Sequence, residues 1–337
     1  MIKAVLLELT PNSRFHFGKA SIDANTALAD TDEFLHSDVL FSALVNNLAQ
    51  VKDKAFVDEF VACFERRGIK ISSGFYCIKE GDNYEYLLPK PVTATNFIKE
   101  YSMIKAVKKI QFIPTALWDV SPENWFNGSC IETKRALLPK KNGLERIENL
   151  YTKEIVPNLV KHKPDDNAKG PFSIAVIQIP KINNGISIHF YFLYEINDSV
   201  PENMKSAFKY AVDMIAFNGL GGERSSGCGF VERVNWDGPE FPIPHLSTGF
   251  TTNLGLLMPD KNEFDNCLFY KLITRGGRKS KEIEQLKRVR MISEGAIIHN
   301  TGQEFGRTVA LSTAHLRYGQ PICINIPQFY GDERIDK

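Results

Sequence analysis

The sequence lacks a long uninterrupted apolar run, which excludes a helix that spans a membrane. Its opening segment, residues 1–9, is apolar but is broken by Glu8 and is too short for a signal peptide. This segment therefore predicts a first β-strand. We expect a cytoplasmic protein without a membrane partner.

Paired cysteines are absent as well. The six cysteines are scattered along the chain, and no two of them form a C-x-x-C pair. This pattern argues against a zinc ribbon and against a redox-active pair. We expect reduced thiols, no bound metal and no cofactor.

An excess of one charge is also missing, because the formal net charge of the 337 residues is only +1. The length predicts two domains, and 43% hydrophobic with 24% charged residues is typical of a globular protein. A surface for nucleic acid would therefore depend on local segregation of charge. Residues 271–290 carry eight basic side chains against two acidic ones, although such a run is more often a solvated face.

Glycine is abundant in one place. Five glycines surround Arg224, Ser225 and Ser226 in residues 218–231, between a predicted helix and a predicted strand at residues 230–236. Glycine permits positive φ and a close approach to a ligand, successive N–H groups can hold an anion, and arginine suits phosphate. The segment predicts a loop that contacts a phosphate backbone.

Two familiar nucleotide loops do not fit this segment. A P-loop requires Lys-Ser or Lys-Thr where Cys228 follows Gly227, and a dinucleotide fingerprint requires a third glycine where Arg224 stands. Both motifs also run from strand to helix, the reverse of the order here. A glycine helix cap followed by a bulged hairpin remains an open alternative.

The order of predicted elements indicates a ferredoxin-like α+β unit in residues 1–240. A strand near residues 2–9 precedes a helix from about Ser37, which could be its N-cap, and strands near 69–78 and 84–88 follow. Residues 89–171 are irregular and read as an insertion. Strands at 172–179 and 186–196, a helix, the glycine-rich loop and a strand complete the unit.

Residues 241–337 follow a proline-rich joint and predict a second, smaller sheet domain. We expect its strands near residues 251–257, 266–273, 295–299 and 322–326. No repeat of fixed period is visible, although the two parts could be diverged copies of one unit.

Several separated segments together resemble one family, the RAMP proteins of type III CRISPR effectors, and within it subunit four of the Csm complex. The resemblance rests on residues 36–44, 88–91, the glycine-rich loop, 273–277 and 315–319, which occur in the family's order. It implies an α+β fold with two ferredoxin-like, RRM-like domains and a thumb inserted in the first.

The resemblance also implies a function without catalysis. Such a subunit grips the repeat-derived 5′ handle of the CRISPR RNA, docks the large polymerase-like subunit and starts the filament of backbone RAMP subunits. Glu223 departs from the family, which often has a basic residue there. The candidate RNA-binding residues are Gly219, Leu220, Gly221, Gly222, Arg224, Ser225, Ser226, Gly227 and Gly229, with His16 and Lys90 as weaker candidates.

Catalysis is the alternative to a binding role. Asp38 could cut RNA, but it lies in the first turn of a predicted helix, where a carboxylate meets the helix dipole favourably, so we interpret it as structural. His16 and His36 could be the acid and base of a metal-independent endoribonuclease that processes CRISPR RNA. A third possibility is a scaffold that binds only proteins.

Other residues have two interpretations each. Arg275, Arg278 and His36 are weak candidates for contacts with RNA or a partner subunit, and the two arginines could equally lie in a solvated hairpin. Three phenylalanines could stack on bases but fit a core better, namely Phe15, Phe17 and Phe112. We expect Tyr318 to pack the second domain against the first.

Overall fold

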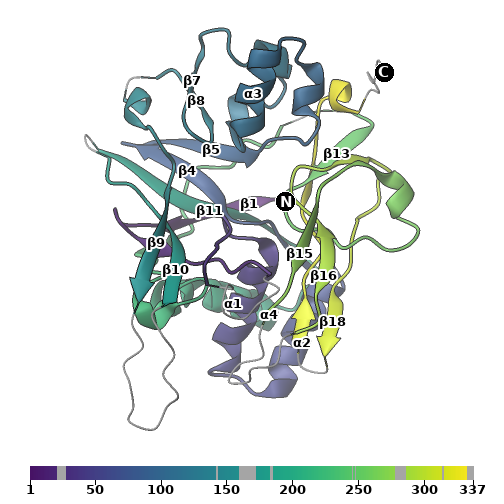
Figure 1. The fold of residues 1–337 in the computed structure, drawn as a ribbon. Helices are drawn as coiled ribbons and strands as arrows, with labels where there is room; N and C mark the ends of the chain where they lie inside the picture. Colours follow the sequence, from purple (N-terminus) through teal and green to yellow (C-terminus); the bar gives the residue numbers. More distant parts are fainter. Residues whose placement is uncertain are drawn as a thin grey trace.

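The computed structural model describes residues 1–20, 28–141, 143–158, 172–182, 185–244, 246, 248–277, 286–312 and 315–331. Helices and strands alternate along the first two thirds of the chain, whereas strands dominate the last third (Figure 1). The predicted mixed α and β class is confirmed.

One antiparallel sheet forms the centre of the molecule, in the order β12-β1-β11-β4-β5-β6, and β3 pairs with β11 beside β4. Its strands are β1 (Lys3–Glu8), β3 (Ile69–Ile71), β4 (Phe75–Glu80), β5 (Asn83–Pro89), β6 (Phe112–Pro114), β11 (Ile186–Ile196) and β12 (Arg233–Asn235). The strand expected at 69–78 is thus two strands, and the one expected at 230–236 is shorter.

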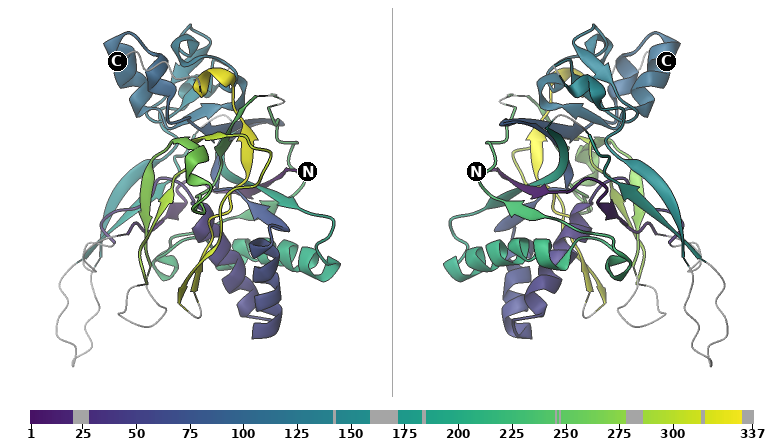
Figure 2. Two further views of the ribbon diagram at one scale, coloured as in Figure 1. Left: turned by 90° about the vertical axis from the view of Figure 1, so that its right-hand side faces the viewer. Right: turned by 90° about the vertical axis from the view of Figure 1, so that its left-hand side faces the viewer.

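Four helices gather on one side of this sheet (Figures 1 and 2). They are α1 (Ser37–Ala49), α2 (Lys54–Glu65), α4 (Glu202–Asp213) and the short α5 (Ile215–Asn218). Leu40, Leu44 and Leu48 repeat every four residues along α1 and are fully buried, which fixes the side of α1 that packs. The N-cap of α1 is His36 rather than Ser37.

The chain order of these elements explains the topology. Helix α1 connects β1 to β4, and α4 connects β11 to β12. Numbered along the chain, the four strands β12-β1-β11-β4 have the order 4-1-3-2, with every pair antiparallel. This is the arrangement of a β-α-β-β-α-β unit.

The predicted insertion at 89–171 is more regular than expected. Its strand β6 extends the main sheet beyond β5, while α3 (Tyr101–Lys109) and the hairpin β7 (Cys130–Glu132) with β8 (Leu137–Pro139) lie at the opposite end of the molecule from α1 (Figure 1). The end of the insertion, 159–171, lies outside the described residues.

A small second sheet has the order β2-β10-β9. Strands β9 (Thr152–Asn158) and β10 (Phe172–Gln178) project from the body of the molecule, and the short β2 (Arg14–Phe15) joins them to it (Figure 2).

The C-terminal part contains a four-stranded antiparallel sheet in the order β14-β17-β13-β20. Its strands are β13 (Phe250–Asn253), β14 (Cys267–Phe269), β17 (Ile297–His299) and β20 (Cys323–Asn325). Two hairpins branch from it, β15 (Leu272–Arg275) with β16 (Val289–Ile292) and β18 (Val309–Ser312) with β19 (His315–Arg317). Among its described residues no α-helix occurs, so a second complete ferredoxin-like domain is not confirmed.

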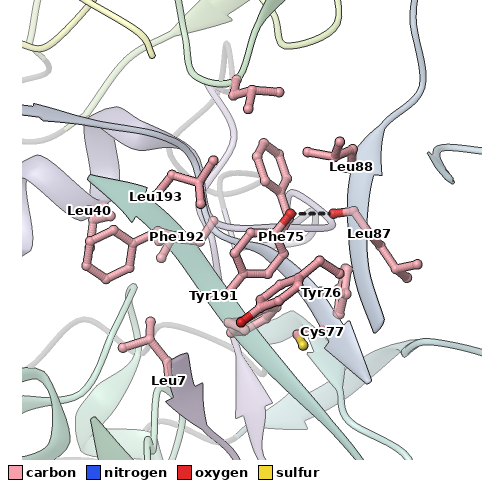
Figure 3. Packing of buried hydrophobic residues seen from close by; sticks show 14 of the residues in the cluster. Leu7, Leu40, Phe75, Tyr76, Cys77, Leu87, Leu88, Tyr191, Phe192 and Leu193 are labelled. Carbon is pink, nitrogen blue, oxygen red and sulfur yellow. Dashed lines mark hydrogen bonds between the residues drawn. The ribbon is translucent and has the colours of Figure 1, made fainter. Parts of the chain in front are cut away.

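The two parts share the main hydrophobic core, and two smaller buried clusters lie within the C-terminal part. The main core runs from Val5 in β1 to Tyr330 near the C-terminus and surrounds the aromatic side chains of the main sheet, where Tyr191 donates to the Leu87 carbonyl at 2.9 Å (Figure 3). Tyr318 stacks on Phe41 of α1 with ring centroids 5.3 Å apart, as expected of a residue that packs the C-terminal part onto the first.

Nothing among the described helices is both long enough and apolar enough to cross a membrane.

Candidate nucleic-acid interface

The glycine-rich loop departs from helical geometry at Gly219, directly after the end of α5. Gly219 ends α5 with φ 72° and donates to the Ile215 carbonyl at 2.8 Å, so the expected glycine cap is present. Positive φ then recurs at Gly221, Glu223, Gly227 and Gly229. The loop is therefore a tightly folded segment and not only a helix cap.

The loop is hydrogen-bonded to the backbone of residues 14–16, in and directly after β2. The N–H of Gly222 donates to the His16 carbonyl at 2.9 Å, and the N–H of Gly229 donates to the Arg14 carbonyl at 2.6 Å. A Cβ on Gly221 would lie 2.5 Å from the His16 carbonyl oxygen, and one on Gly229 would lie 2.3 Å from the carbonyl oxygen of Leu220. The chain's own backbone therefore makes the close approach that requires these two glycines.

The tip of the loop, residues 224–227, is exposed. Glu223 adopts the left-handed conformation (φ 56°, ψ 30°), and a single 3-10 turn at Arg224–Ser226 follows it. The successive N–H groups of Glu223, Arg224 and Ser225 have no acceptor among the described residues. A left-handed residue followed by a right-handed turn makes the concave set of N–H groups that binds anions.

Arg224 adds positive charge beside these N–H groups. Its Nη1 donates to the Asn218 carbonyl at 3.0 Å, which holds the exposed side chain over its own loop and leaves other guanidinium donors available. A cleft of about 140 Å³ separates the loop from α1, and its wall includes Gly18, Ser42 and Asn46. The arrangement suits one phosphate group at the tip and polar contacts along the cleft.

Two predicted contact residues support the loop from inside. Leu220 is fully buried, and its N–H donates to the Gly229 carbonyl. His16 is 4% exposed, and because its Nδ1 lies 2.8 Å from the Ala175 carbonyl, which only accepts, Nδ1 carries the proton. Neither side chain reaches the surface, which corrects the prediction that they contact RNA directly.

Arg275 ends strand β15 of the β15–β16 hairpin, but its side chain is buried and not solvated, which corrects its assignment as an RNA or partner contact. Its guanidinium donates to Asp38 Oδ2 from Nε at 3.0 Å and to Asp32 Oδ2 from Nη1 at 2.6 Å. Arg317 Nη1 donates to the same Asp38 oxygen at 2.6 Å. Burial by itself would raise the pKa of Asp38, but the two arginine charges lower it well below its usual range.

The contacts of Asp38 favour the structural interpretation of that residue. Both of its oxygens accept from Arg275, and its side chain is fully buried. A carboxylate enclosed in this way has no open position for a metal ion or for a scissile phosphate.

His36 extends the same buried cluster. Its Nδ1 lies 2.9 Å from Glu294 Oε1, and its Nε2 lies 3.5 Å from Asp32 Oδ2. Burial opposes the charged imidazole, but the Glu294 and Asp32 carboxylates outweigh it and raise the pKa of His36. His36 is 3% exposed, so the prediction that it contacts RNA or a partner is wrong for this arrangement.

Lys90 lies at the end of β5, half-buried, where its Nζ donates to the Val107 carbonyl of α3. Lys90 is far from the glycine-rich loop in the sequence, and it lines a different cleft from the one beside the loop. Arg278 lies outside the described residues.

Sequence reasoning missed two exposed aromatic side chains that flank the loop. Phe217 of α5 is 81% exposed and Phe230 is 52% exposed. Exposed aromatic rings beside this glycine-rich loop would suit stacking on unpaired bases. The sequence did contain a signal for them, because Phe217 directly precedes the glycine-rich segment and Phe230 directly follows its last glycine.

Comparisons with known proteins identify relatives of this chain in sequence and in fold. No protein-family model matches the chain. The CRISPR system Cms protein Csm4 of Methanocaldococcus jannaschii is 28% identical over 341 residues, which span 89% of this chain and 86% of the relative.

Solved structures agree in fold. A chain from a crystal structure of a Csm3-Csm4 subcomplex in the type III-A CRISPR-Cas interference complex matches with a TM-score of 0.66 and 23% identity, covering 96% of this chain and 98% of that one. A chain from a Csm1-Csm4 cassette in complex with pppApA matches with a TM-score of 0.57 and 18% identity, covering 97% and 99%. The chain is thus similar to a Csm4 protein in sequence over most of its length, and it has the fold of chains from Csm complexes over nearly all of it.

Proposed function

We propose that this subunit anchors the 5′ handle of the CRISPR RNA through the glycine-rich loop. The loop tip carries this proposal, because the consecutive N–H groups of residues 223–225 have no acceptor among the described residues and the exposed Arg224 lies beside them. N–H groups and arginine bind a phosphate backbone irrespective of sequence, and Phe217 and Phe230 add surfaces for unpaired bases.

The proposed partners are the large polymerase-like subunit and the first backbone RAMP subunit. The solved structures with the same fold hold Csm4 together with Csm1 or with Csm3. We propose that this chain joins the equivalent two subunits and thereby connects the signalling subunit to the filament.

We propose further that the chain is not an enzyme. Asp38, His16 and His36, the candidates for RNA cleavage, are each less than 5% exposed and are occupied by hydrogen bonds within the protein. A general base must reach the proton that it removes, so these contacts disfavour the endoribonuclease alternative.

The C-terminal part is proposed to be a reduced second ferredoxin-like domain. Numbered along the chain, β14-β17-β13-β20 have the order 2-3-1-4, which is the order of the first unit in reverse. The hairpin β18–β19 stands between β17 and β20, where the second helix of such a unit belongs.

The proposed function is tested by co-expressing the chain with the other subunits and a CRISPR array, purifying the complex through a tag on this chain, and sequencing the RNA that crosslinks to it. Crosslinks concentrated in the repeat-derived 5′ end, at Ser225, Ser226 or their neighbours, are expected. Crosslinks spread over the spacer would make this a backbone-type subunit, and their absence would leave a protein scaffold. Sequence-defined RNA fragments that disappear in His16→Ala or His36→Ala would instead favour the nuclease.

A further inference from the structure

A second cleft, separate from the one beside the glycine-rich loop, lies between β5, α3 and the β15–β16 hairpin. Its volume is about 380 Å³, within the range of small-ligand sites. Four lysines line it, and we call it the lysine cleft: Lys19, Lys90, Lys108 and Lys271.

Three of these lysines lack an acidic partner among the described residues, whereas Lys19 Nζ lies 3.0 Å from Asp30 and 4.0 Å from Asp32. Lys90 donates to a neutral carbonyl. Burial and the neighbouring Lys271 charge together lower the pKa of Lys90 to about 8. An anion between Lys90 and Lys271 would remove this repulsion.

Each carboxylate in the wall of the cleft already has a partner other than Lys90, Lys108 and Lys271, although the buried Oε2 of Glu294 accepts no hydrogen bond from the described residues. Asp32 pairs with Arg275. Glu33 lies 3.4 Å from Arg135 and accepts from Gln111. Glu294 pairs with His36 and accepts from Ser73. The positive charge of Lys90, Lys108 and Lys271 is therefore not neutralised from within the cleft.

The lysine cleft and the glycine-rich loop meet at consecutive residues of the chain. Gly18 lines the cleft beside the loop, and Lys19 lines the lysine cleft. Because these two residues are adjacent in the chain, the two clefts are neighbours at this point, which places both along a path open to one RNA strand. Half-buried Phe34 in the wall of the lysine cleft offers that strand an aromatic surface.

We propose that the lysine cleft is a second phosphate-binding site for the RNA strand that the glycine-rich loop holds, with a backbone phosphate between Lys90 and Lys271. The inference rests on the proposed function and extends it to a second surface. The residues that line this surface include no arginine and no residue of the glycine-rich loop. Continuity with the loop favours RNA over an acidic segment of a partner protein.

The test compares two double variants of the full chain that lose equal charge. Lys90→Ala with Lys271→Ala removes the phosphate contacts, and Lys54→Ala with Lys261→Ala removes two exposed lysines elsewhere. Affinity for a fluorescent RNA containing the repeat-derived 5′ end is measured at several salt concentrations, together with thermal unfolding. A poly-glutamate peptide is the second probe.

The cleft variant is expected to bind this RNA about tenfold or more weakly than the control variant, since each lost contact is a charge-assisted one. The slope of log affinity against log salt should fall by about 0.7 for each phosphate contact removed. The variant Lys90→Arg keeps the charge, so it should retain most of the affinity of the unaltered chain. This result would show that the weaker binding of the cleft variant does not come from a folding defect.

Proton uptake supplies a second readout. Because a bound phosphate favours charged Lys90, the affinity of the unaltered chain should fall as the pH rises above about 8, where free Lys90 loses its proton. Lys90→Arg should remove this fall. The other titratable groups of the wall are unchanged in that comparison, namely Lys19, Asp32, Glu33, His36, Lys108, Lys271 and Glu294.

The possible failures can be told apart. Equal RNA affinity in the two double variants, with Arg224→Ala still impaired, would overturn the lysine cleft and leave the proposed function intact. Loss of poly-glutamate binding alone would assign the cleft to an acidic protein segment and overturn it too. Absence of RNA binding by the unaltered chain would defeat the proposed function itself.

Discussion

Arg275 and Asp38 are 237 positions apart in the sequence and yet form a buried ion pair. Asp32 and Arg317 complete the arrangement, with Arg275 Nη1 2.6 Å from Asp32 Oδ2. A buried charge is tolerated only when it is paired and hydrogen-bonded, so each member of this group depends on the others.

Replacing Arg275 with alanine should therefore destabilise the chain strongly. Two buried carboxylates would lose a partner, which typically costs about 3 to 5 kcal/mol of unfolding free energy. Urea unfolding of Arg275→Ala measures this loss. The matched control is Lys271→Ala, an exposed residue just before the same strand, which should change stability by less than about 0.5 kcal/mol. Equal effects of the two substitutions would contradict the buried pair.

Arg224 is the residue-scale test of the glycine-rich loop. Arg224→Ala should weaken binding of the 5′ handle by about 1.5 to 3 kcal/mol, because a charge-assisted phosphate contact is lost. That corresponds to roughly 10- to 150-fold in the dissociation constant. Fluorescence anisotropy with handle RNA measures it, and the exposed Arg66→Ala of the helical side is the control. If Arg224→Ala unfolds at the same urea concentration as the unaltered chain and binds handle RNA with the same affinity, the loop is not the handle-binding site.

At the scale of elements, the glycines of the loop separate into two kinds. Gly221 and Gly227 both have positive φ, at 80° and 84°. A Cβ at Gly221 would meet the His16 carbonyl oxygen at 2.5 Å, whereas one at Gly227 would meet nothing within 4 Å. The two positions share the conformational penalty and differ only in the steric one.

Alanine at the two positions should consequently have different effects. Gly227→Ala should cost about 1 to 2 kcal/mol of stability from the left-handed conformation alone. Gly221→Ala should cost clearly more and should also reduce RNA retention, because the loop must move away from β2. Urea unfolding and RNA anisotropy of both variants check this. If Gly221→Ala were no worse than Gly227→Ala, the loop would not need its contact with residues 14–18.

At the scale of the whole molecule, the buried charges connect the two parts of the chain. Asp32, His36 and Asp38 belong to the first part, and they meet Arg275, Glu294 and Arg317 of the second. With His36 protonated, three cations face three carboxylates. The shared core and this charge cluster together predict that the chain unfolds in one cooperative transition.

This cluster gives the molecule a pH dependence. The folded pKa of His36 is raised above 6.5, so its contribution to stability is complete below pH 6.5 and is lost as the pH rises through the folded value. The folded pKa of Glu294 is lowered below 4.5, so its contribution is complete above pH 4.5 and is lost as the pH falls through that lowered value. The pair should stabilise the fold most between about pH 4.5 and 6.5.

His36→Gln isolates this contribution, because glutamine stays neutral at every pH. The difference in unfolding free energy between the unaltered chain and His36→Gln should shrink as the pH rises from 6.5 to 9. Chemical denaturation at several pH values measures it. A difference that stays constant over that range would show that His36 is not charged in the folded state.

Local sequence patterns predicted most elements of the first β-α-β-β-α-β unit. The spacing of Leu40, Leu44 and Leu48 predicted α1, and the alternation of strands and helices predicted the unit whose order is now 4-1-3-2. Helix α2 was missed although Asp53 caps it by accepting from the Phe56 N–H. The short strands β3 and β14 were merged with their neighbours, since turns between short strands leave little trace in hydrophobic periodicity.

By itself, the sequence determined the mixed fold, the position of the glycine-rich loop and the exclusion of the familiar nucleotide loops, because these depend on residues that are near one another in the chain. Only the tertiary structure decided that Arg275, His36 and Asp38 are buried partners, that Gly221 faces a carbonyl of its own chain, and that Lys90 and Lys271 line one cleft. Those outcomes depend on contacts between distant segments, and burial and charge pairing arise only when such segments meet.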